Sequence, residues 1–225
     1  MKTNSSISNS NNTLIFDFDG TLADTEQINF VIMNELAEQH NFQKMTIDDM
    51  QRLKTLSAKK VLNFFQIPWY KTPYILYQGK KQLAQRIDKV QAFEHLSQLL
   101  FLLKENYQLG IVTTNSKKNI TQFLINNQLN IFDFIHCNAK LLGKERALQK
   151  TIKKQKLNAS STLYIGDEIR DIIAAHHCKL AIAAVSWGYN SINALQQQQP
   201  DYLVHSINEL KLAIDDFFIT KDIST

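Results

Sequence analysis

The sequence predicts an α/β protein: a Rossmann-like, doubly wound parallel sheet with an inserted helical cap. The first observation is a set of apolar runs without polar alternation, which is typical of strands buried on both faces of a sheet. They lie at 14–16, 109–114 and 162–167, and weaker candidates lie at 132–137 and 180–185. The second observation is that helical patterns alternate with these strands, at 96–106, 117–127, 144–154 and 168–177. Such alternation indicates βαβ units and a parallel sheet.

The third observation is a segment that breaks this alternation, from about Thr25 to Val90. It contains helical patterns and a turn marked by Pro68 and Pro73, but no convincing strand. All of it falls between the first and second predicted strands. We therefore expect a helical cap domain at 25–90 that is inserted into an α/β core domain made of 13–24 and 91–215. A disordered polar leader is expected at 1–12 and a C-terminal tail at 216–225.

Composition and charge restrict the classes of function. The chain has 225 residues, 44% of them hydrophobic, which is enough for a substantial core and excludes global disorder. A formal charge of +4 is too small to indicate a nucleic-acid partner. Segment 1–12 lacks the apolar run of a signal peptide, and no segment approaches the roughly 20 apolar residues that span a bilayer. Cys137 and Cys178 lack metal-ligand spacing and suit a reducing compartment, so we expect a cytoplasmic protein without a membrane partner.

Two carboxylates follow the first predicted strand. Asp17 and Asp19 are two residues apart, so on an extended backbone both side chains point to the same side. They stand at the carboxyl end of a strand, where open α/β sheets bind ligands, and Gly20 allows a tight turn beyond them. Adjacent carboxylates repel each other unless a cation lies between them, and Mg²⁺ prefers oxygen ligands. The pair therefore indicates a magnesium site.

Groups at other strand ends fit the same chemistry. Thr114 and Asn115 follow the second predicted strand, and Asp167 follows another and opens a helix that carries Asp171 one turn on. Lys144 begins a further helix and supplies a cation. Phosphoryl transfer depends on positioning and on neutralising charge around the transferring group. A hydroxyl, an ammonium group and a metal held by carboxylates are therefore the parts that this reaction needs.

The same residues also have interpretations that involve no catalysis. An aspartate after a strand can cap the following helix, and one in a first helical turn interacts favourably with the helix dipole. Thr113 competes with Thr114 as the hydroxyl, and it faces the other way on an extended strand. Lys140 competes with Lys144 as the cation.

The order of these groups resembles that of a known family. The segment Asp17–Thr21 looks like the first signature of the haloacid dehalogenase-like superfamily. Thr114, Lys144 and the segment Gly166–Asp171 resemble its second, third and fourth motifs, in the right order. The resemblance covers about Leu14–Leu210 and is strongest to the phosphoglycolate-phosphatase-like hydrolases, in which a helical cap follows the first strand.

The resemblance implies roles in catalysis. Asp17 would attack phosphorus and become an aspartyl phosphate, which divides hydrolysis into two steps. Asp19 would protonate the leaving alkoxide and then deprotonate the attacking water. The phosphate oxygens would be bound by Thr114, the Asn115 amide and Lys144.

The resemblance also implies a set of metal ligands. Mg²⁺ would be held by Asp17, by Asp19 through its backbone carbonyl, and by Asp167. Asp171 would orient the site from outside the immediate ligands. Glu168 is an alternative acidic contact, and the sequence does not rank it against Asp171.

Single residues indicate which reaction of the superfamily this chain catalyses. Asp19 is a proton donor suited to an alkoxide leaving group, which argues against a dehalogenase or a phosphonatase. Related mutases carry a His and an Arg at the positions of Asn29 and Ala58, which argues against a mutase.

The loop Leu53–Ser57 carries the candidate substrate contacts, Lys54 and Ser57, although Thr55 replaces the glycine of relatives. Lys54 could pair with a carboxylate on a substrate such as phosphoglycolate.

The predicted function is therefore a magnesium-dependent phosphatase for small phosphate monoesters, phosphoglycolate-like, that forms an aspartyl-phosphate intermediate. Its partner is a small phosphorylated metabolite, and the protein is a monomer or a homodimer. The alternatives are a pyrophosphatase or nucleotidase of the same superfamily, or a non-catalytic binding protein that keeps the fold. A non-catalytic protein would have no chemical use for both carboxylates of the first motif.

Overall fold

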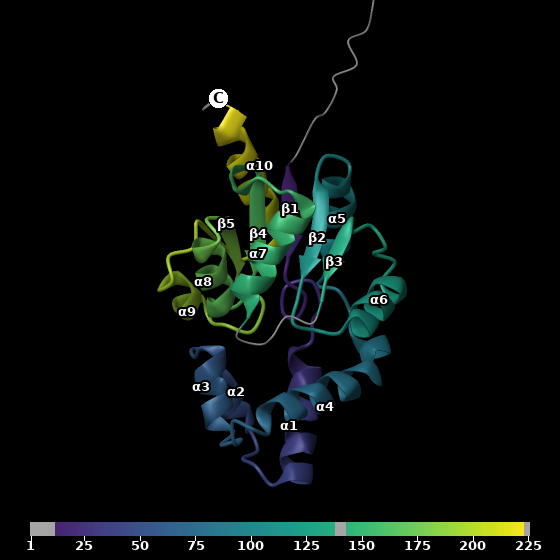
Figure 1. Ribbon diagram of the computed structural model, residues 1–225, viewed down its shortest axis with the longest axis vertical. Helices are drawn as coiled ribbons and strands as arrows, with labels where there is room; N and C mark the ends of the chain where they lie inside the picture. Colours follow the sequence, from purple (N-terminus) through teal and green to yellow (C-terminus); the bar gives the residue numbers. More distant parts are fainter. Residues whose placement is uncertain (1–11, 138–142, 223–225) are drawn as a thin grey trace, which may run out of the picture.

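A computed structural model of the chain describes residues 12–137 and 143–222, with a six-stranded parallel sheet at its centre (Figure 1). The strand order is β3-β2-β1-β4-β5-β6. Because successive strands are added on one side of β1 and then on the other, this is the doubly wound α/β fold that the sequence predicts. The strands are β1 (Thr13–Phe16), β2 (Gln108–Val112), β3 (Phe134–His136), β4 (Thr162–Gly166), β5 (Ala181–Val185) and β6 (Tyr202–Val204).

Helices cover both faces of this sheet, because alternate residues of a strand point to opposite sides. Leu14 and Phe16 belong to one hydrophobic cluster and Ile15 to the other, and all three are fully buried. The first cluster includes side chains of α5 (Leu96–Lys104), α6 (Lys117–Asn126) and α10 (Ile207–Asp222). The second includes side chains of α7 (Lys144–Gln155), α8 (Ile169–His177) and α9 (Ile192–Gln196). Short 3-10 helices are η1 (Ile87–Lys89) and η2 (Ala159–Ser161).

Of the helices that lie between β1 and β2 in the sequence, the first four form a separate group next to the carboxyl ends of the strands (Figure 1). They are α1 (Glu26–His40), α2 (Ile47–Leu53), α3 (Ala58–Phe64) and α4 (Thr72–Ala84). We call this group the cap. The two chain segments that join it to the sheet pair with each other, because Ala23 forms an antiparallel bridge with Ala92 and the Asp24 N–H donates to the Gln91 carbonyl oxygen. This pairing supports the proposal that the cap, residues 25–90, is a domain of its own.

The C-terminal region differs from the expectation. Helix α10 continues through Asp222, and Phe217 and Phe218 are buried in the core, so the tail expected from residue 216 begins too early. Strand β6 and helix α9 were not expected, because elements of three and five residues are too short for a periodic pattern. The expected leader, apart from Asn12, lies outside the described residues.

Two further observations concern the helices and the cysteines. Across 12–137 and 143–222, none of the helices has both the length and the apolar character needed to cross a membrane. Cys137 and Cys178 are both free thiols. The Cys178 thiol donates to the Glu145 carbonyl oxygen at 3.6 Å, so it serves packing between α7 and α8.

Candidate active site

The candidate site lies where β1, β2 and β4 end. Phe16 of β1 is in register with Ile111 of β2 and with Ile165 of β4, so the residues that follow these strands emerge at one edge of the sheet. The connection order reverses at β1, and open α/β sheets bind ligands at such a point. The aspartates after β1 and β4 and the polar residues after β2 are thereby brought together.

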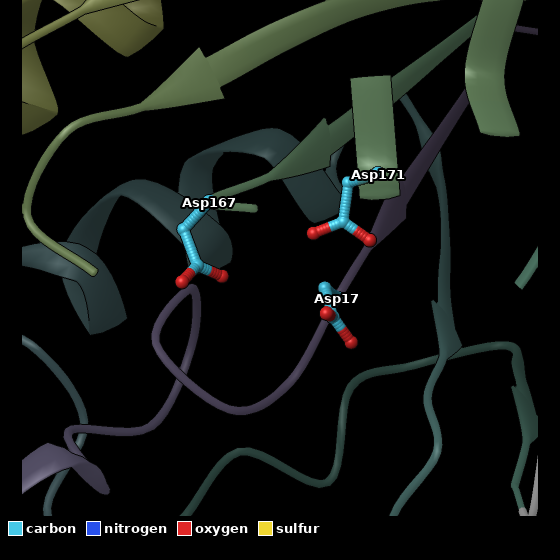
Figure 2. A group of neighbouring side chains, drawn as sticks. All are labelled: Asp17, Asp167 and Asp171. Carbon is cyan, nitrogen blue, oxygen red and sulfur yellow. The ribbon is translucent and has the colours of Figure 1, made fainter. Parts of the chain in front are cut away.

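Three carboxylates meet at this edge (Figure 2). One oxygen from each of Asp17, Asp167 and Asp171 lies within 4.8 Å of the others, and all three side chains are buried. Burial raises the pKa of Asp17 to about 6 even though Lys144 lies beside it. Burial and the neighbouring acids hold the pKa of Asp167 well above its usual range. A hard divalent cation stabilises mutually repelling oxygen donors, so the residues present fit such an ion.

The Asp167 side chain is held in one orientation by two donors. The Thr21 hydroxyl donates to its Oδ1 at 2.7 Å, and the Tyr189 backbone N–H donates to its Oδ2 at 2.8 Å. Two glycines make room for this carboxylate. A Cβ on Gly20, whose φ is +79°, would lie 2.3 Å from Oδ2, and a Cβ on Gly188 would lie 2.2 Å from it. The turn after β1 therefore requires glycine for both its backbone conformation and its close approach.

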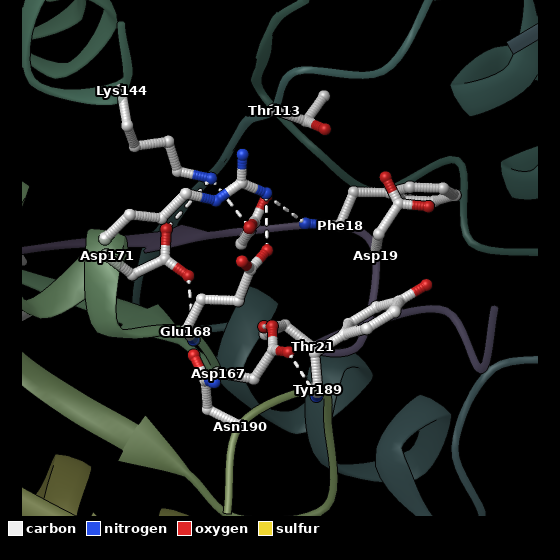
Figure 3. A network of polar contacts seen from close by, with 12 residues as sticks. Phe18, Asp19, Thr21, Thr113, Lys144, Asp167, Glu168, Asp171, Tyr189 and Asn190 are labelled. Atoms are coloured by element: carbon white, nitrogen blue, oxygen red, sulfur yellow. Dashed lines mark hydrogen bonds and ion pairs between the residues drawn. The ribbon is translucent and has the colours of Figure 1, made fainter. Parts of the chain in front are cut away.

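Lys144 places its ammonium group among the carboxylates (Figure 3). Its Nζ lies 2.6 Å from Asp17 Oδ2 and 3.1 Å from Asp171 Oδ1, and the side chain is buried. Burial lowers the pKa of Lys144, but the charges of Asp17 and Asp171 outweigh it and raise the pKa overall. Asp171 is fixed by further donors, the Tyr164 hydroxyl at 3.1 Å and the Glu168 N–H at 3.1 Å. Asp171 thus orients Lys144 toward Asp17 and caps helix α8.

Asp19 is oriented by Asn115, in an arrangement that differs from the expected one. The Asn115 side-chain amide donates to Asp19 Oδ1 at 3.1 Å and Oδ2 at 3.0 Å, and its own Oδ1 accepts from Asn119 at 2.9 Å. The backbone N–H of Asn115 donates to the Thr113 hydroxyl. Both amide groups of Asn115, expected to bind phosphate, are therefore engaged within the protein. Burial and the charge of Asp17 raise the pKa of Asp19 to about 6, which suits a general acid–base.

The two candidate threonines occupy different environments. Strand β2 ends at Val112, earlier than expected, and Thr113 is fully buried in the turn that follows. Thr114 is half-buried and lines a cavity between the cap and the sheet, next to Asp19. The geometry favours Thr114 as the hydroxyl that meets a ligand in the cavity. Lys140, the alternative to Lys144, lies outside the described residues.

Arg170 is a further cation that the sequence-based prediction missed. It pairs with Glu168, and both residues line the cavity. Burial lowers the pKa of Arg170, but Glu168, Asp171 and Asp17 raise it overall. Burial also raises the pKa of Glu168 against the opposing charge of Arg170. The group of three carboxylates contains Asp171 and not Glu168, so we expect Asp171 rather than Glu168 to support a metal site. The signal for Arg170 was its position within the fourth motif.

The loop between α2 and α3 is attached to the sheet domain through its backbone. The buried Asn190 side-chain amide donates to the carbonyl oxygens of Lys54 at 2.8 Å and Leu56 at 3.0 Å. Asn190 Oδ1 in turn accepts the Ile169 N–H at 2.9 Å, at the start of α8. The Lys54 ammonium group lies 2.8 Å from Glu26 Oε1. Lys54 thus reaches the cavity wall, as expected of a substrate contact, but its charge is already paired.

A second attachment joins helix α1 to the same core loop. The Tyr189 hydroxyl accepts from Asn29 Nδ2 at 2.6 Å and lies 3.0 Å from the Thr25 hydroxyl. Ser57, the other expected substrate contact, is half-buried at the N-cap of α3, and its neighbours Leu56 and Ala58 line the cavity. The sequence predicts that Tyr189 lies in a loop at the rim of the site, but it assigns no contact to Tyr189 or to Asn190. Their only signal in the sequence is that they follow β5 at the same edge of the sheet.

Comparisons with known proteins identify related sequences and structures. The sequence profile of the haloacid dehalogenase-like hydrolase family matches residues 14–185. The phosphoglycolate phosphatase of Synechococcus elongatus is 29% identical over 203 residues, covering 89% of this chain and 96% of that protein. The pyrophosphatase PpaX of Oceanobacillus iheyensis is 25% identical and covers 92% of this chain and 98% of that protein. The structure of a predicted phosphatase from Clostridium acetobutylicum has the same fold, with a TM-score of 0.79 at 21% identity over 91% of this chain and 98% of that one.

These similarities confirm the resemblance given by the motifs, and with it an enzyme of the phosphoric ester hydrolase class. The family match contains all three carboxylates of the acidic group, Asp17, Asp167 and Asp171, and all of the cap. This chain belongs to the haloacid dehalogenase-like hydrolase family.

Proposed function

We propose that the protein is a magnesium-dependent phosphatase that hydrolyses small phosphate monoesters through an aspartyl phosphate on Asp17. One observation carries the proposal: a buried group of three carboxylates with Lys144 Nζ 2.6 Å from Asp17 and Asp19 two residues on. The carboxylates fit a hard cation, and Lys144 neutralises charge next to the nucleophile. A protein that only bound phosphate would gain nothing from burying repelling acids beside its anionic ligand.

In the proposed reaction, an Asp17 carboxylate oxygen forms a bond to phosphorus while the bond from phosphorus to the ester oxygen breaks. Asp19 gives its proton to the leaving alkoxide and becomes a carboxylate. It then takes a proton from water, whose oxygen attacks the phosphorus of the aspartyl phosphate. Inorganic phosphate leaves, and Asp17 and the protonated Asp19 are restored. Lys144 and Thr114 hold the phosphoryl oxygens throughout.

The ion would be held by Asp17, the Asp19 backbone carbonyl and Asp167, with Asp171 in support. It would supply positive charge for the phosphoryl oxygens. Asp171 contributes through Lys144 and through its hydrogen bonds to Tyr164 and Glu168. Phosphoglycolate is the reference substrate, because a relative carries that activity in its name. Pyrophosphate is the second candidate for the same reason.

We expect Mg²⁺ to be required for activity and to stabilise the fold. Phosphate release from an aryl phosphate should cease in excess chelator and return with Mg²⁺, and Ca²⁺ should inhibit because it accepts looser geometry. At a Mg²⁺ concentration of about 100 Kd, binding adds about 2.7 kcal/mol, or about 5–10 °C in Tm for a chain of this size. Asp167→Asn should remove this shift, whereas Asp48→Asn at an exposed position of α2 should keep it. Full activity in chelator would exclude the proposal.

A second expectation concerns Lys54. Its pair with Glu26 argues against a direct bond to a substrate carboxylate, so Lys54→Ala should lower kcat/KM for phosphoglycolate and for an uncharged ester by the same factor. We expect a factor of about five at most, as for a partly exposed ion pair. The measurement is kcat/KM for both substrates in the wild type and the variant. A loss confined to phosphoglycolate would instead make Lys54 the carboxylate-binding residue that the sequence suggests.

A further inference from the structure

A chamber of about 300 Å³ extends from the candidate active site into the cap. At its core end it is lined by Asp19, Thr114 and Asn115, which follow β1 and β2 in the candidate active site. All four cap helices and the segment before α2 contribute to its walls. Most of the side chains deeper in the chamber are apolar, among them Phe30, Met33, Met45, Met50, Val61 and Leu62.

The apolar walls differ from the packed core of the cap. In that core, Leu36 of α1 is fully buried and does not line the chamber. Met50 and Val61, by contrast, are only half-buried and belong to the chamber wall. An apolar wall that faces water contributes little to folding, because its surface is not removed from solvent. A ligand with apolar surface would remove it.

The methionines of the chain are concentrated in this wall. The sequence contains four, and apart from Met1 all of them, Met33, Met45 and Met50, line the chamber. Methionine is unbranched and polarizable, so it adapts to apolar ligands of irregular shape. The wall therefore suits a range of hydrocarbon groups rather than one rigid shape.

The charged residues of the chamber lie at its core end. Glu26 begins α1, and Lys54 is attached to the core through the bond from Asn190 to its carbonyl oxygen. Lys80 is placed similarly, because its carbonyl oxygen accepts from Asn119 of α6 at 3.1 Å. Charge is thus gathered around the phosphate position. A substrate with a charged or strongly polar leaving group would have to desolvate it against the apolar end, which is unfavourable.

From this division we propose that the preferred substrates are phosphate monoesters of apolar alcohols, whose hydrocarbon part occupies the chamber while the phosphate lies at Asp17. The inference rests on the proposed function and adds the chemistry of the leaving group. A volume of about 300 Å³ is at the lower end of the range of small-ligand pockets. It holds a short alkyl chain or a single aromatic ring.

The test is kcat/KM for a series of n-alkyl phosphates from methyl to octyl, with phosphoglycolate and a nucleoside monophosphate for comparison. Each methylene buried in the chamber should raise kcat/KM about fourfold until the chamber is full, so that hexyl phosphate exceeds methyl phosphate by about 10²–10³. Phosphoglycolate should lie well below hexyl phosphate. Hexylphosphonate should inhibit the wild-type enzyme more strongly than methylphosphonate does. This comparison measures the same preference without turnover and without a variant.

Matched valine variants locate the preference. Val61→Phe should fill the chamber and reduce the ratio of hexyl to methyl phosphate by about tenfold or more. Val31 lies on α1 at an exposed position, so Val31→Phe should keep the wild-type ratio. A flat series in an active enzyme, together with equal inhibition by the two phosphonates, would overturn this inference and leave the phosphatase proposal standing. Failure to hydrolyse any ester with Mg²⁺, including a small aryl phosphate, would instead refute the proposed function.

Discussion

Asp17→Asn should abolish turnover while the protein stays folded. The neutral amide is a very poor nucleophile, and loss of the attacking group typically costs on the order of 10⁵–10⁶ in kcat. The side chain keeps its size, and its carbonyl oxygen can still accept the Phe18 N–H that now donates to Asp17 Oδ1 at 2.7 Å. Phosphate release under saturating Mg²⁺ measures the loss.

The structure explains why this substitution is compatible with folding. Asparagine gives up the contact with Lys144, which remains 3.1 Å from Asp171. The substitution also removes the buried Asp17 carboxylate, whose pKa burial raises to about 6. Repulsion between the carboxylates of the acidic group therefore falls. We therefore expect Tm to change by only a few degrees. Asp24→Asn, at an exposed position of the same loop, is the matched control and should keep wild-type activity. Wild-type rates in Asp17→Asn would refute the covalent mechanism.

Much of the fold could be predicted from the sequence, because each central strand is a continuous apolar run of neighbouring residues. Leu14, Ile15 and Phe16 are an uninterrupted apolar run, and the structure buries all three completely in β1. The aspartates at the ends of such runs could be placed at one edge for the same reason. In a parallel sheet, all carboxyl ends lie on one side once the strands are adjacent. Asp17 and Asp167 therefore meet although 150 residues separate them.

The contacts that could not be predicted join residues from distant elements. Asn115 is near the predicted phosphate site in sequence, but only the fold shows that its amide is bonded to Asp19 rather than open to a ligand. The bond from Asn190 to the Lys54 carbonyl likewise links a core loop to the cap across 136 positions. Single side chains of this kind have no periodicity. Their role depends on which backbone groups the tertiary structure leaves without partners.

These contacts also connect the cap to the chemistry. Asn190 binds the loop between α2 and α3, which we call the cap loop, through the carbonyl oxygens of Lys54 and Leu56. It also binds the start of α8 through the Ile169 N–H. Helix α8 carries Asp171, which orients Lys144. The position of the cap loop and the position of the Lys144 ammonium group are thus set by the same short helix end. This connection is consistent with a cap that covers the site while the first phosphoryl transfer proceeds.

Asp19→Ala should trap the enzyme as its aspartyl phosphate, but only with some substrates. Asp17 and Lys144 remain in place, so an aryl phosphate, whose leaving group needs little protonation, should still phosphorylate Asp17. The second step needs Asp19 as the base for water, and loss of a general base lowers the rate about 10²–10⁴-fold. The expected result is a burst of one phenolate per active site followed by slow release. An alkyl phosphate, which needs Asp19 as an acid in the first step, should give no burst.

Two measurements check this expectation. Rapid-mixing assays report the burst, and mass spectrometry of the quenched protein should show one added phosphoryl group, located on the peptide that contains Asp17. Ser186→Ala in the loop after β5, whose hydroxyl lies 3.0 Å from His205 Nδ1, is a control that should show neither the burst nor the added mass. A burst of equal size with alkyl and aryl esters would exclude Asp19 as the general acid. Slow turnover of the aryl ester without a phosphorylated peptide would exclude Asp19 as the base of the second step, because the intermediate would then form no faster than it decays.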